Sequence, residues 1–296
     1  MKISRLLQTL VGVMAFTLAA SATAADTIVV GGKGFTEQQI MAEMTSQLLR
    51  AKGYTVDTRA GMGSAVLRQA QVNGQIDVYW EYTGTALIVY DKIKERLSAA
   101  DGYAKVKELD AAKGLVWLNP SKANNTYALA MRKAEADKLG IHTLSDLAKV
   151  LDAKKRLTLA VNAEFYGRPD GLRPLEKTYG FELPREDIKR MDTGLTYQAL
   201  RDKQVDIALV FATDGRIPAF NFVVLKDNKD FFPSYALTPV IRKAVLDKNP
   251  QLGTILNALS AKLDDETMAH LNAEVDVDHK SINSVCEAFL KKVQLI

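Results

Sequence analysis

Six aromatic and basic residues stand at the ends of expected strands, where side chains can converge on one ligand. They are Lys33, Tyr82, Tyr127, Arg168, Phe211 and Tyr235. Aromatic faces attract a quaternary ammonium group, because that group has positive charge and apolar methyls but no N–H to donate. A carboxylate on the same ligand suits basic, hydroxyl and backbone N–H groups, which Lys33, Arg168, Thr85 and residues 35–38 offer. These residue types predict a site for a small quaternary ammonium compound.

The sequence is poorly supplied with catalytic groups. Its three histidines lack the spacing of a metal site, and no Gly-x-Ser-x-Gly motif marks a nucleophile. Glu81, Asp170 and Asp214 lie in expected turns, but the sequence does not show that any two of them converge. We therefore expect no catalytic residue, no metal and no cofactor, and a protein that is not an enzyme.

The densest motif is the segment 76–85, which contains Tyr79, Trp80 and Tyr82. Its β-branched and aromatic residues predict a strand that ends at Gly84. Because side chains of a strand alternate between its faces, Trp80 and Tyr82 are expected on one face and Tyr79 on the other. For this segment alone, a buried aromatic plug and a ligand site both remain open.

Strand-like runs alternate with helical patterns along the chain. Strands are expected at 27–32, 54–60, 115–118, 158–161, 188–191, 206–211 and 222–225, an extended run at 231–241, and mostly helix after 243. A short helix is expected at 145–151 with Ser145 as its cap. The alternation predicts an α/β fold with mainly parallel sheets. Segments 66–84 and 199–215 each place a helix before a strand with a polar turn, which suggests two similar lobes with a ligand cleft between them.

The first 24 residues have the pattern of a cleaved export signal, with Lys2 and Arg5 before an apolar run and Ala22-Thr23-Ala24 at its end. No cysteine near the cut offers a site for a lipid anchor, so we expect a free protein in a Gram-negative periplasm. Cleavage lowers the net charge from +4 to +2, which argues against a nucleic-acid partner. The single cysteine, Cys286, is expected to be a small buried hydrophobe.

Six motifs follow one another through the chain. They are Gly-Gly-Lys-Gly-Phe-Thr-Glu-Gln at 31–38, Glu-Tyr-Thr-Gly-Thr at 81–85, Asn-Asn-Thr-Tyr-Ala-Leu at 124–129, Phe-Tyr-Gly-Arg-Pro-Asp-Gly at 165–171, Ala-Thr-Asp-Gly-Arg at 212–216 and Phe-Phe-Pro-Ser-Tyr at 231–235. Together they resemble the osmoprotectant-binding proteins of ABC importers, which bind glycine betaine, choline or related quaternary ammonium compounds. The resemblance covers essentially all of the chain after the export signal.

This resemblance implies a two-lobed periplasmic-binding-protein fold of type II, with crossovers near 127–129 and 232–235 and the ligand cleft between the lobes. Lobe 1 is expected to comprise residues 25–127 and 233–296, and lobe 2 residues 128–232. The resemblance also implies an inner-membrane ABC importer permease as partner, and we expect a monomer.

The family's site residues map onto eight positions. The aromatic cage falls on Tyr82, Tyr127, Phe211 and Tyr235, the carboxylate contacts on Lys33, Thr85 and Arg168, and a polar neighbour on Gln38. The position of Phe211 is usually tyrosine in the family. Phenylalanine keeps the π face but loses the hydroxyl, so we predict weaker betaine binding than in members with tyrosine there.

The sequence thus predicts a periplasmic protein that captures a quaternary ammonium osmoprotectant for an ABC importer. Three alternatives remain open. The ligand is another amino acid or zwitterion; the protein is a periplasmic enzyme that uses Asp214 or Glu81 as general base; or the protein is a sensor that presents its closed form to a membrane receptor.

Overall fold

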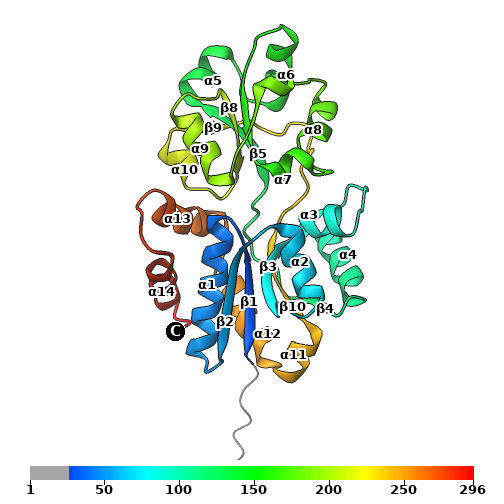
Figure 1. Cartoon of the computed structure of the whole chain (residues 1–296), viewed down its shortest axis with the longest axis vertical. Coiled ribbons are helices and arrows are strands. Elements are labelled where there is room, and N and C mark those ends of the chain that lie inside the picture. Colours follow the sequence, from blue (N-terminus) through cyan, green and yellow to red (C-terminus); the bar gives the residue numbers. More distant parts are fainter. Residues whose placement is uncertain (1–26) are drawn as a thin grey trace, which may run out of the picture.

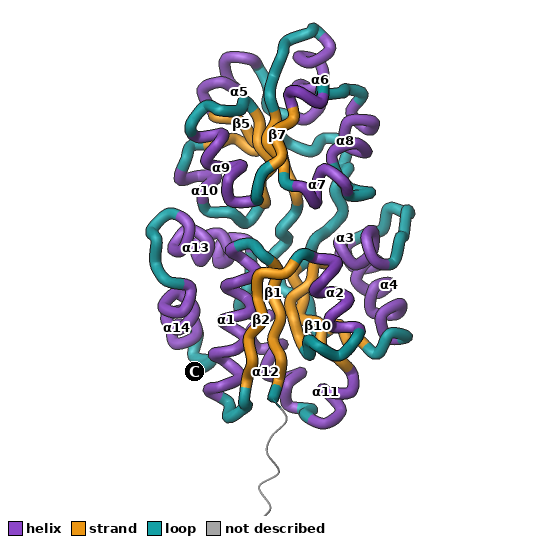
Figure 2. The backbone as a smooth tube through the Cα atoms, viewed as in Figure 1, coloured by secondary structure: helices purple, strands orange, loops and turns teal. Residues whose placement is uncertain are grey.

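The computed structural model describes residues 27–296, so the export signal expected at 1–24 lies outside the described residues. The chain forms two α/β lobes, one above the other in Figure 1, and two chain segments connect them. Each lobe is built on a five-stranded sheet. Helices cover both faces of the sheets, as the backbone trace in Figure 2 shows.

The chain forms most of the first lobe, then the whole second lobe, and then returns to complete the first lobe. The first lobe begins with β1 (Ile28–Lys33), α1 (Thr36–Ala51), β2 (Val56–Met62), α2 (Ser64–Val72), β3 (Val78–Tyr82), α3 (Thr83–Thr85), a π-helical turn (Ala86–Tyr90), α4 (Ala99–Ala111) and β4 (Leu115–Trp117). The second lobe contains β5 (Tyr127–Arg132), α5 (Lys133–Leu139), α6 (Leu144–Asp152), β6 (Leu159–Val161), α7 (Ala163–Gly167), α8 (Leu172–Tyr179), a 3₁₀ turn (Arg185–Asp187), β7 (Ile188–Arg190), α9 (Thr193–Arg201), β8 (Ile207–Phe211), α10 (Arg216–Ala219) and β9 (Phe222–Val224). The chain then returns to the first lobe with β10 (Leu237–Arg242), α11 (Lys243–Lys248), α12 (Gln251–Ser260), α13 (Asp265–Asp276) and α14 (Ile282–Lys292).

The two sheets have the same topology. Their strand orders are β2-β1-β3-β10-β4 and β7-β6-β8-β5-β9. In each sheet, the strand that follows a crossover (β10 or β5) runs antiparallel to both of its neighbours, while the first three strands are parallel. The helix–strand pairs α2–β3 and α9–β8 occupy equivalent places, which confirms the similarity expected between segments 66–84 and 199–215.

The two connecting segments lie side by side between the lobes. An antiparallel bridge joins Asn124 to Ala236. The backbone N–H of Asn125 donates to the carbonyl of Tyr235 at 3.3 Å, and the N–H of Leu237 donates to the carbonyl of Ala123 at 2.9 Å. These bonds satisfy backbone groups that the sheets leave unpaired, and they hold both crossovers at one place.

Strand β3 shows the alternation expected from its sequence. Trp80 and Tyr82 lie in the large hydrophobic cluster that spans both lobes, whereas Tyr79 packs with Leu67 and Ile76 on the other face. The strand ends at Tyr82, two residues before the predicted stop, and Thr83–Thr85 form a helical turn. A side chain at Gly84 would meet Tyr235 at 2.8 Å, so the glycine permits the close approach of the second crossover.

Two smaller expectations have different outcomes. Ser145 is not the cap of α6; Thr143 caps the helix instead. Its hydroxyl accepts from the backbone N–H of Asp146, and the Asp146 carboxylate accepts from the backbone N–H of Thr143, which together form a capping box. Cys286 is fully buried and its thiol donates to the carbonyl of Ile40 at 3.4 Å, as expected for a small core residue. Burial raises the pKa of this thiol to about 12.

Within residues 27–296, no helix is long and apolar enough to cross a membrane. In the same part of the chain, no group of three or more His, Cys, Asp or Glu side chains is arranged to hold a metal ion.

Candidate ligand-binding site

A small cavity of about 40 Å³ lies between the two lobes, beside the crossovers. Six of the eight predicted site residues line it: Lys33, Tyr82, Thr85, Tyr127, Phe211 and Tyr235. Its other lining residues are Phe35, Ser64, Asn125, Asn162, Glu164 and Thr193. The space is small, on the order of three water molecules, in this arrangement of the lobes.

Strand ends place the predicted side chains at the cavity. Lys33 and Tyr82 are the last residues of the parallel strands β1 and β3, and Phe211 is the last residue of β8. Tyr127 begins β5, which runs antiparallel to β8, and it pairs directly with Phe211. The carboxyl ends of the central strands of both lobes therefore face each other across the cavity, the usual place for a ligand in α/β folds.

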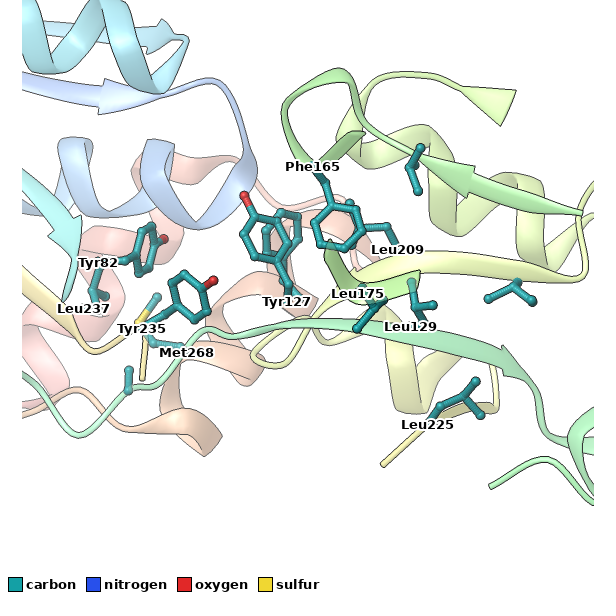
Figure 3. Packing of buried hydrophobic residues seen from close by; sticks show 14 of the residues in the cluster. Tyr82, Tyr127, Leu129, Phe165, Leu175, Leu209, Leu225, Tyr235, Leu237 and Met268 are labelled. Carbon is teal, nitrogen blue, oxygen red and sulfur yellow. The ribbon is translucent and has the colours of Figure 1, made fainter. Parts of the chain in front are cut away.

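The aromatic rings form a nearly continuous wall. The ring centroid of Tyr127 lies 5.1 Å from that of Phe211 and 5.6 Å from that of Tyr235, with the latter ring edge-on. Figure 3 shows Tyr82, Tyr127 and Tyr235 near one another between the two lobes, with Phe165 beside Tyr127 on the side away from Tyr82. These rings also join the hydrophobic cores of the lobes into one cluster.

Phe35 is a wall of this cavity that the sequence analysis missed. Its ring stacks on Phe211 with centroids 5.3 Å apart and planes inclined by 4°, and it lies 6.3 Å from Tyr82. Phe35 also lines a larger chamber of about 730 Å³, which opens outward between residues 61–64 and residues 188–193. The ring thus borders both the inner cavity and the open cleft. An aromatic residue directly after the glycine turn that ends β1 was the available signal.

Lys33 is held by a buried ion pair with Glu81. Its Nζ lies 2.5 Å from Glu81 Oε1 and 4.9 Å from the centroid of the Tyr82 ring, and the Lys33 and Glu81 side chains are 4% and 0% exposed. Glu81 also accepts hydrogen bonds from the backbone N–H of Tyr82 at 2.7 Å and from the hydroxyls of Tyr79 and Tyr90 at 2.9 and 3.1 Å. The parallel neighbours β1 and β3 bring these two charges together.

Arg168 lies behind Thr85 and does not line the inner cavity. Its Nε and Nη2 each donate to Asp170 at 2.7 Å, its Nη1 donates to Glu164 at 3.0 Å, and it lies 3.4 Å from the hydroxyl of Thr85. The guanidinium also stands 5.1 Å from the centroid of the Tyr127 ring. Burial opposes its charge, but Tyr127 and Asp170 together hold the pKa of Arg168 above its ordinary value.

Gln38 is fully buried below the cavity and is not among its lining residues. Its amide N–H donates to the carbonyl of Trp80 at 2.8 Å, and its oxygen accepts from the backbone N–H of Lys33 at 3.4 Å. The side chain links β1 to β3, which positions Lys33 and Tyr82. A direct contact of Gln38 with ligand stays a prediction.

Glu37 joins the two lobes behind Tyr82. The carboxylate accepts hydrogen bonds from the hydroxyls of Tyr82 and Thr213 at 2.7 and 2.5 Å, and from the amides of Asn125 and Asn272 at 2.9 and 3.3 Å. Thr213 follows β8 of the second lobe, whereas the other donors come from the first lobe and a crossover. Burial raises the pKa of Glu37, and the four hydrogen bonds only partly oppose this rise.

Other contacts close the lobes around the cavity. The Ser64 hydroxyl donates to Glu164 at 3.0 Å, and the Tyr235 hydroxyl donates to Asp170 at 2.5 Å. On the far side, α13 packs against the turn before α10, where Arg216 pairs with Asp276 at 3.1 Å. The structure therefore represents a closed arrangement of the lobes.

The two acids considered as general bases are both held as hydrogen-bond acceptors. Asp214 accepts from Nε and Nη2 of Arg216 at 2.9 and 2.5 Å, and Glu81 accepts from four donors. What the inner cavity offers is π faces next to hydroxyl groups. Such a surface recognises an alkylated cation by contact with its methyls and charge.

Comparisons with known proteins agree with this geometry. A family model described as the substrate binding domain of ABC-type glycine betaine transport systems matches residues 26–292. The chain is 45% identical over 299 residues to a glycine-betaine-binding protein of Pseudomonas aeruginosa, covering 99% of this chain and 96% of that protein. It is 34% identical to the glycine betaine-binding protein YehZ of Escherichia coli K12, covering 91% of each. A solved structure described as a glycine betaine/carnitine/choline ABC transporter is 30% identical, with a TM-score of 0.74 over 90% of this chain and 99% of that one. The chain belongs to the family of substrate-binding domains of ABC-type glycine betaine transport systems.

Proposed function

We propose that this protein is a periplasmic solute-binding protein that captures a quaternary ammonium osmoprotectant, such as glycine betaine or choline, and delivers it to an ABC importer. The observation that carries the proposal is the cavity between the lobes, whose walls include the rings of Phe35, Tyr82, Tyr127, Phe211 and Tyr235. Aromatic faces attract a desolvated quaternary ammonium by about 0.5–2 kcal/mol each.

The proposal assigns a role to each of the eight site residues. Tyr82, Tyr127, Phe211 and Tyr235 form the cage, while Lys33, Thr85, Arg168 and Gln38 supply polar contacts around it. Lobe 1 comprises residues 25–127 and 233–296, and lobe 2 comprises 128–232. The lobes close on the ligand by a hinge movement at the crossovers, and an inner-membrane permease recognises the closed form.

A ligand panel tests the proposal. Ligand at about one hundred times its Kd stabilises the folded protein by about 2.7 kcal/mol, which raises Tm by roughly 5 °C or more. We expect such shifts with glycine betaine, choline, carnitine or proline betaine, and a change in fluorescence of Trp80, which lies in the strand that ends at the cage. Absence of both responses with every member of the panel would refute the proposal.

A matched pair of variants localises the binding. Tyr127→Leu removes a π face from the cavity but keeps an apolar side chain, so we expect affinity to fall by about tenfold. Tyr54→Leu makes the same change at the turn between α1 and β2, remote from the cavity, and leaves affinity unchanged. Equal losses in both variants would contradict binding at the cage.

The alternatives give distinct results. Thermal shifts with primary amines but not with quaternary amines would indicate another amino acid or zwitterion as ligand. Turnover of a bound compound, detected by mass spectrometry, would indicate an enzyme. Normal uptake in a deletion strain, together with a lost osmotic response, would indicate a sensor.

A further inference from the structure

Glu37 stands in the motif at 31–38, but it does not line the inner cavity and has no part in the proposed cage. Its carboxylate is almost fully buried and accepts four hydrogen bonds, two on each oxygen. Oε1 accepts from the hydroxyl of Tyr82 and the amide of Asn125, and Oε2 accepts from the hydroxyl of Thr213 and the amide of Asn272. These bonds fill the acceptor sites of an ionised carboxylate, but all four donors are uncharged. The negative charge of Glu37 is therefore hydrogen-bonded but not neutralised.

Within residues 27–296, Glu37 takes part in no ion pair. Three buried basic side chains lie between the lobes, and each is paired with other carboxylates: Lys33 with Glu81, Arg216 with Asp214 and Asp276, and Arg168 with Asp170 and Glu164. Lys33 also lies 4.9 Å from the centroid of the Tyr82 ring, but Glu81, 2.5 Å away, offsets its charge. A buried charge without a partner is unfavourable, and burial raises the pKa of Glu37. The carboxylate thus lacks one positive partner, which a ligand can supply.

Tyr82 connects Glu37 to the inner cavity. Its ring is a wall of the cavity, while its hydroxyl donates to Glu37 at 2.7 Å. A hydroxyl that donates to a carboxylate is polarised, which leaves more negative charge on the ring and strengthens its attraction for a cation. The hydroxyl of Tyr235 donates to Asp170 in the same way, but Arg168 neutralises that carboxylate. Tyr82 is therefore the tyrosine of the cage whose hydroxyl is held by a carboxylate without a cation.

We infer that Glu37 is a specificity-determining residue of this site: its negative charge, acting through Tyr82, selects a cationic head group over an uncharged group of the same shape. This inference rests on the proposed function. A cation within about 6 Å of the Tyr82 ring centroid lies roughly 7–8 Å from the carboxylate. At an effective dielectric constant of about 20, a charge at that separation changes affinity by on the order of tenfold. The hydroxyl of Thr213 comes from the second lobe, so closure of the lobes completes the hydrogen bonds that hold the carboxylate in place.

Two pairs of ligands isolate the effect of charge. Choline is compared with its uncharged analogue, in which a tert-butyl group replaces the trimethylammonium group, and glycine betaine is compared with tert-butylacetic acid. Within a pair, the shape and the second arm are the same, so the ratio of the two Kd values measures the selection of the cation. Titration calorimetry on the complete mature protein, by competition for the weaker ligand, gives both values. A change that only loosens the fold weakens both members of a pair and leaves the ratio unchanged.

Glu37→Gln keeps the shape of the side chain and removes its charge, so the preference for the charged member of each pair is expected to fall about tenfold. Glu43→Gln is the matched control on the same helix, α1. Glu43 accepts from the amides of Gln47 and Asn283 at 2.9 and 3.1 Å and does not line the cavity. This control removes the same charge and leaves the ratio unchanged.

Tyr82→Phe is a second, independent variant. It keeps a ring in the cavity and removes the hydroxyl that links this ring to Glu37, so the preference for the cation is expected to fall a few-fold. This variant decides the question if Glu37→Gln does not fold. An unchanged ratio in Glu37→Gln or in Tyr82→Phe, or an equal fall in Glu43→Gln, overturns the inference and leaves the proposed function standing. Failure of every quaternary ammonium ligand to bind the parent protein overturns both.

Discussion

The role of Phe35 gives the sharpest test of the cage, because the residue was found from the structure alone. Its ring stacks on Phe211 and faces Tyr82, and it lines both the inner cavity and the outer chamber. Phe35 also occupies the N-cap position of α1, but its side chain makes no capping hydrogen bond. Phe35→Ala therefore removes an aromatic wall without removing a cap.

The expected loss follows from the contacts that disappear. One aromatic face contributes about 0.5–2 kcal/mol to the binding of a desolvated cation. A stacked pair of aromatic rings stabilises the cavity wall by about a further 0.5–1.5 kcal/mol. Allowing for partial rearrangement, we expect Phe35→Ala to weaken binding of the quaternary ammonium ligand by about 1–2 kcal/mol, or roughly 5- to 30-fold.

Titration calorimetry measures this loss, with Phe35→Leu as the control for apolar area. Leucine keeps most of the apolar surface but has no π face, so we expect most of the affinity loss to persist in Phe35→Leu. Both variants should keep Tm within a few degrees of the parent, because the ring is only half-buried. Full affinity in Phe35→Leu would show that the ring serves only as bulk and would refute the π-face reasoning.

Three further predictions concern the cage and the closure of the lobes. Phe211→Tyr should raise affinity for glycine betaine a few-fold through a stronger π face, and calorimetry that shows no gain would contradict the weaker binding predicted for phenylalanine. The raised pKa of Glu37 means that the folded protein binds more protons than the unfolded chain from the ordinary value of 4.5 upward, so the free energy of unfolding should fall as pH rises through that window. Urea unfolding at pH 5, 6 and 7 should show that the free energy of unfolding falls less steeply with pH in Glu37→Gln than in the parent. An identical dependence on pH in both would refute Glu37 as its cause. Gly215→Ala places a methyl 2.5 Å from the Cβ of Ala273 and 2.6 Å from the backbone oxygen of Ala269 on α13, so it should oppose closure, weaken binding by about tenfold and lower Tm by several degrees. Unchanged affinity would show that α13 and the turn before α10 can separate in the bound form.

Much of the fold could be predicted from local sequence patterns. Apolar β-branched runs stopped by glycine or polar residues marked most strands, because a buried strand needs an apolar surface and a turn needs conformational freedom. The order of the strands could not be predicted in the same way. The run at 231–241 was expected to be extended, but nothing in its composition indicates that it pairs with β3 and β4 in the sheet.

The positions of the four aromatic residues were noted from residue type and place, and the family resemblance assigned them to a cage, a role that stays a prediction. Tyr82, Tyr127, Phe211 and Tyr235 all stand where a strand begins or ends, or in a crossover, and all four line the cavity. Phe35 was missed because the motif around it predicts a helix start, and a helix start accounts for the residue without any ligand.

The state of the cations could not be predicted from the sequence. Lys33 and Glu81 are 48 positions apart, and their ion pair depends on the parallel pairing of β1 with β3. From the sequence alone, a lysine at a strand end suggests a contact with ligand. Its carboxylate partner in the protein can be identified only when the strand order and register are known. The same limit applies to Gln38, whose amide links two strands below the cavity.

The position of β10 in the first sheet has a consequence for the order of folding. This strand pairs with β3 through contacts such as Leu237 with Tyr82, across 155 residues of chain. The second lobe, by contrast, is one continuous segment whose contacts are more local, and local contacts form faster because they close shorter loops. We therefore expect the inserted lobe to become native first during synthesis or refolding, while the first lobe cannot be completed until the last fifth of the chain is present. A chain that stops before residue 237 would leave β3 as an edge strand and Tyr82 without the neighbour that fixes it, so ligand recognition is the last property that this protein acquires as it folds.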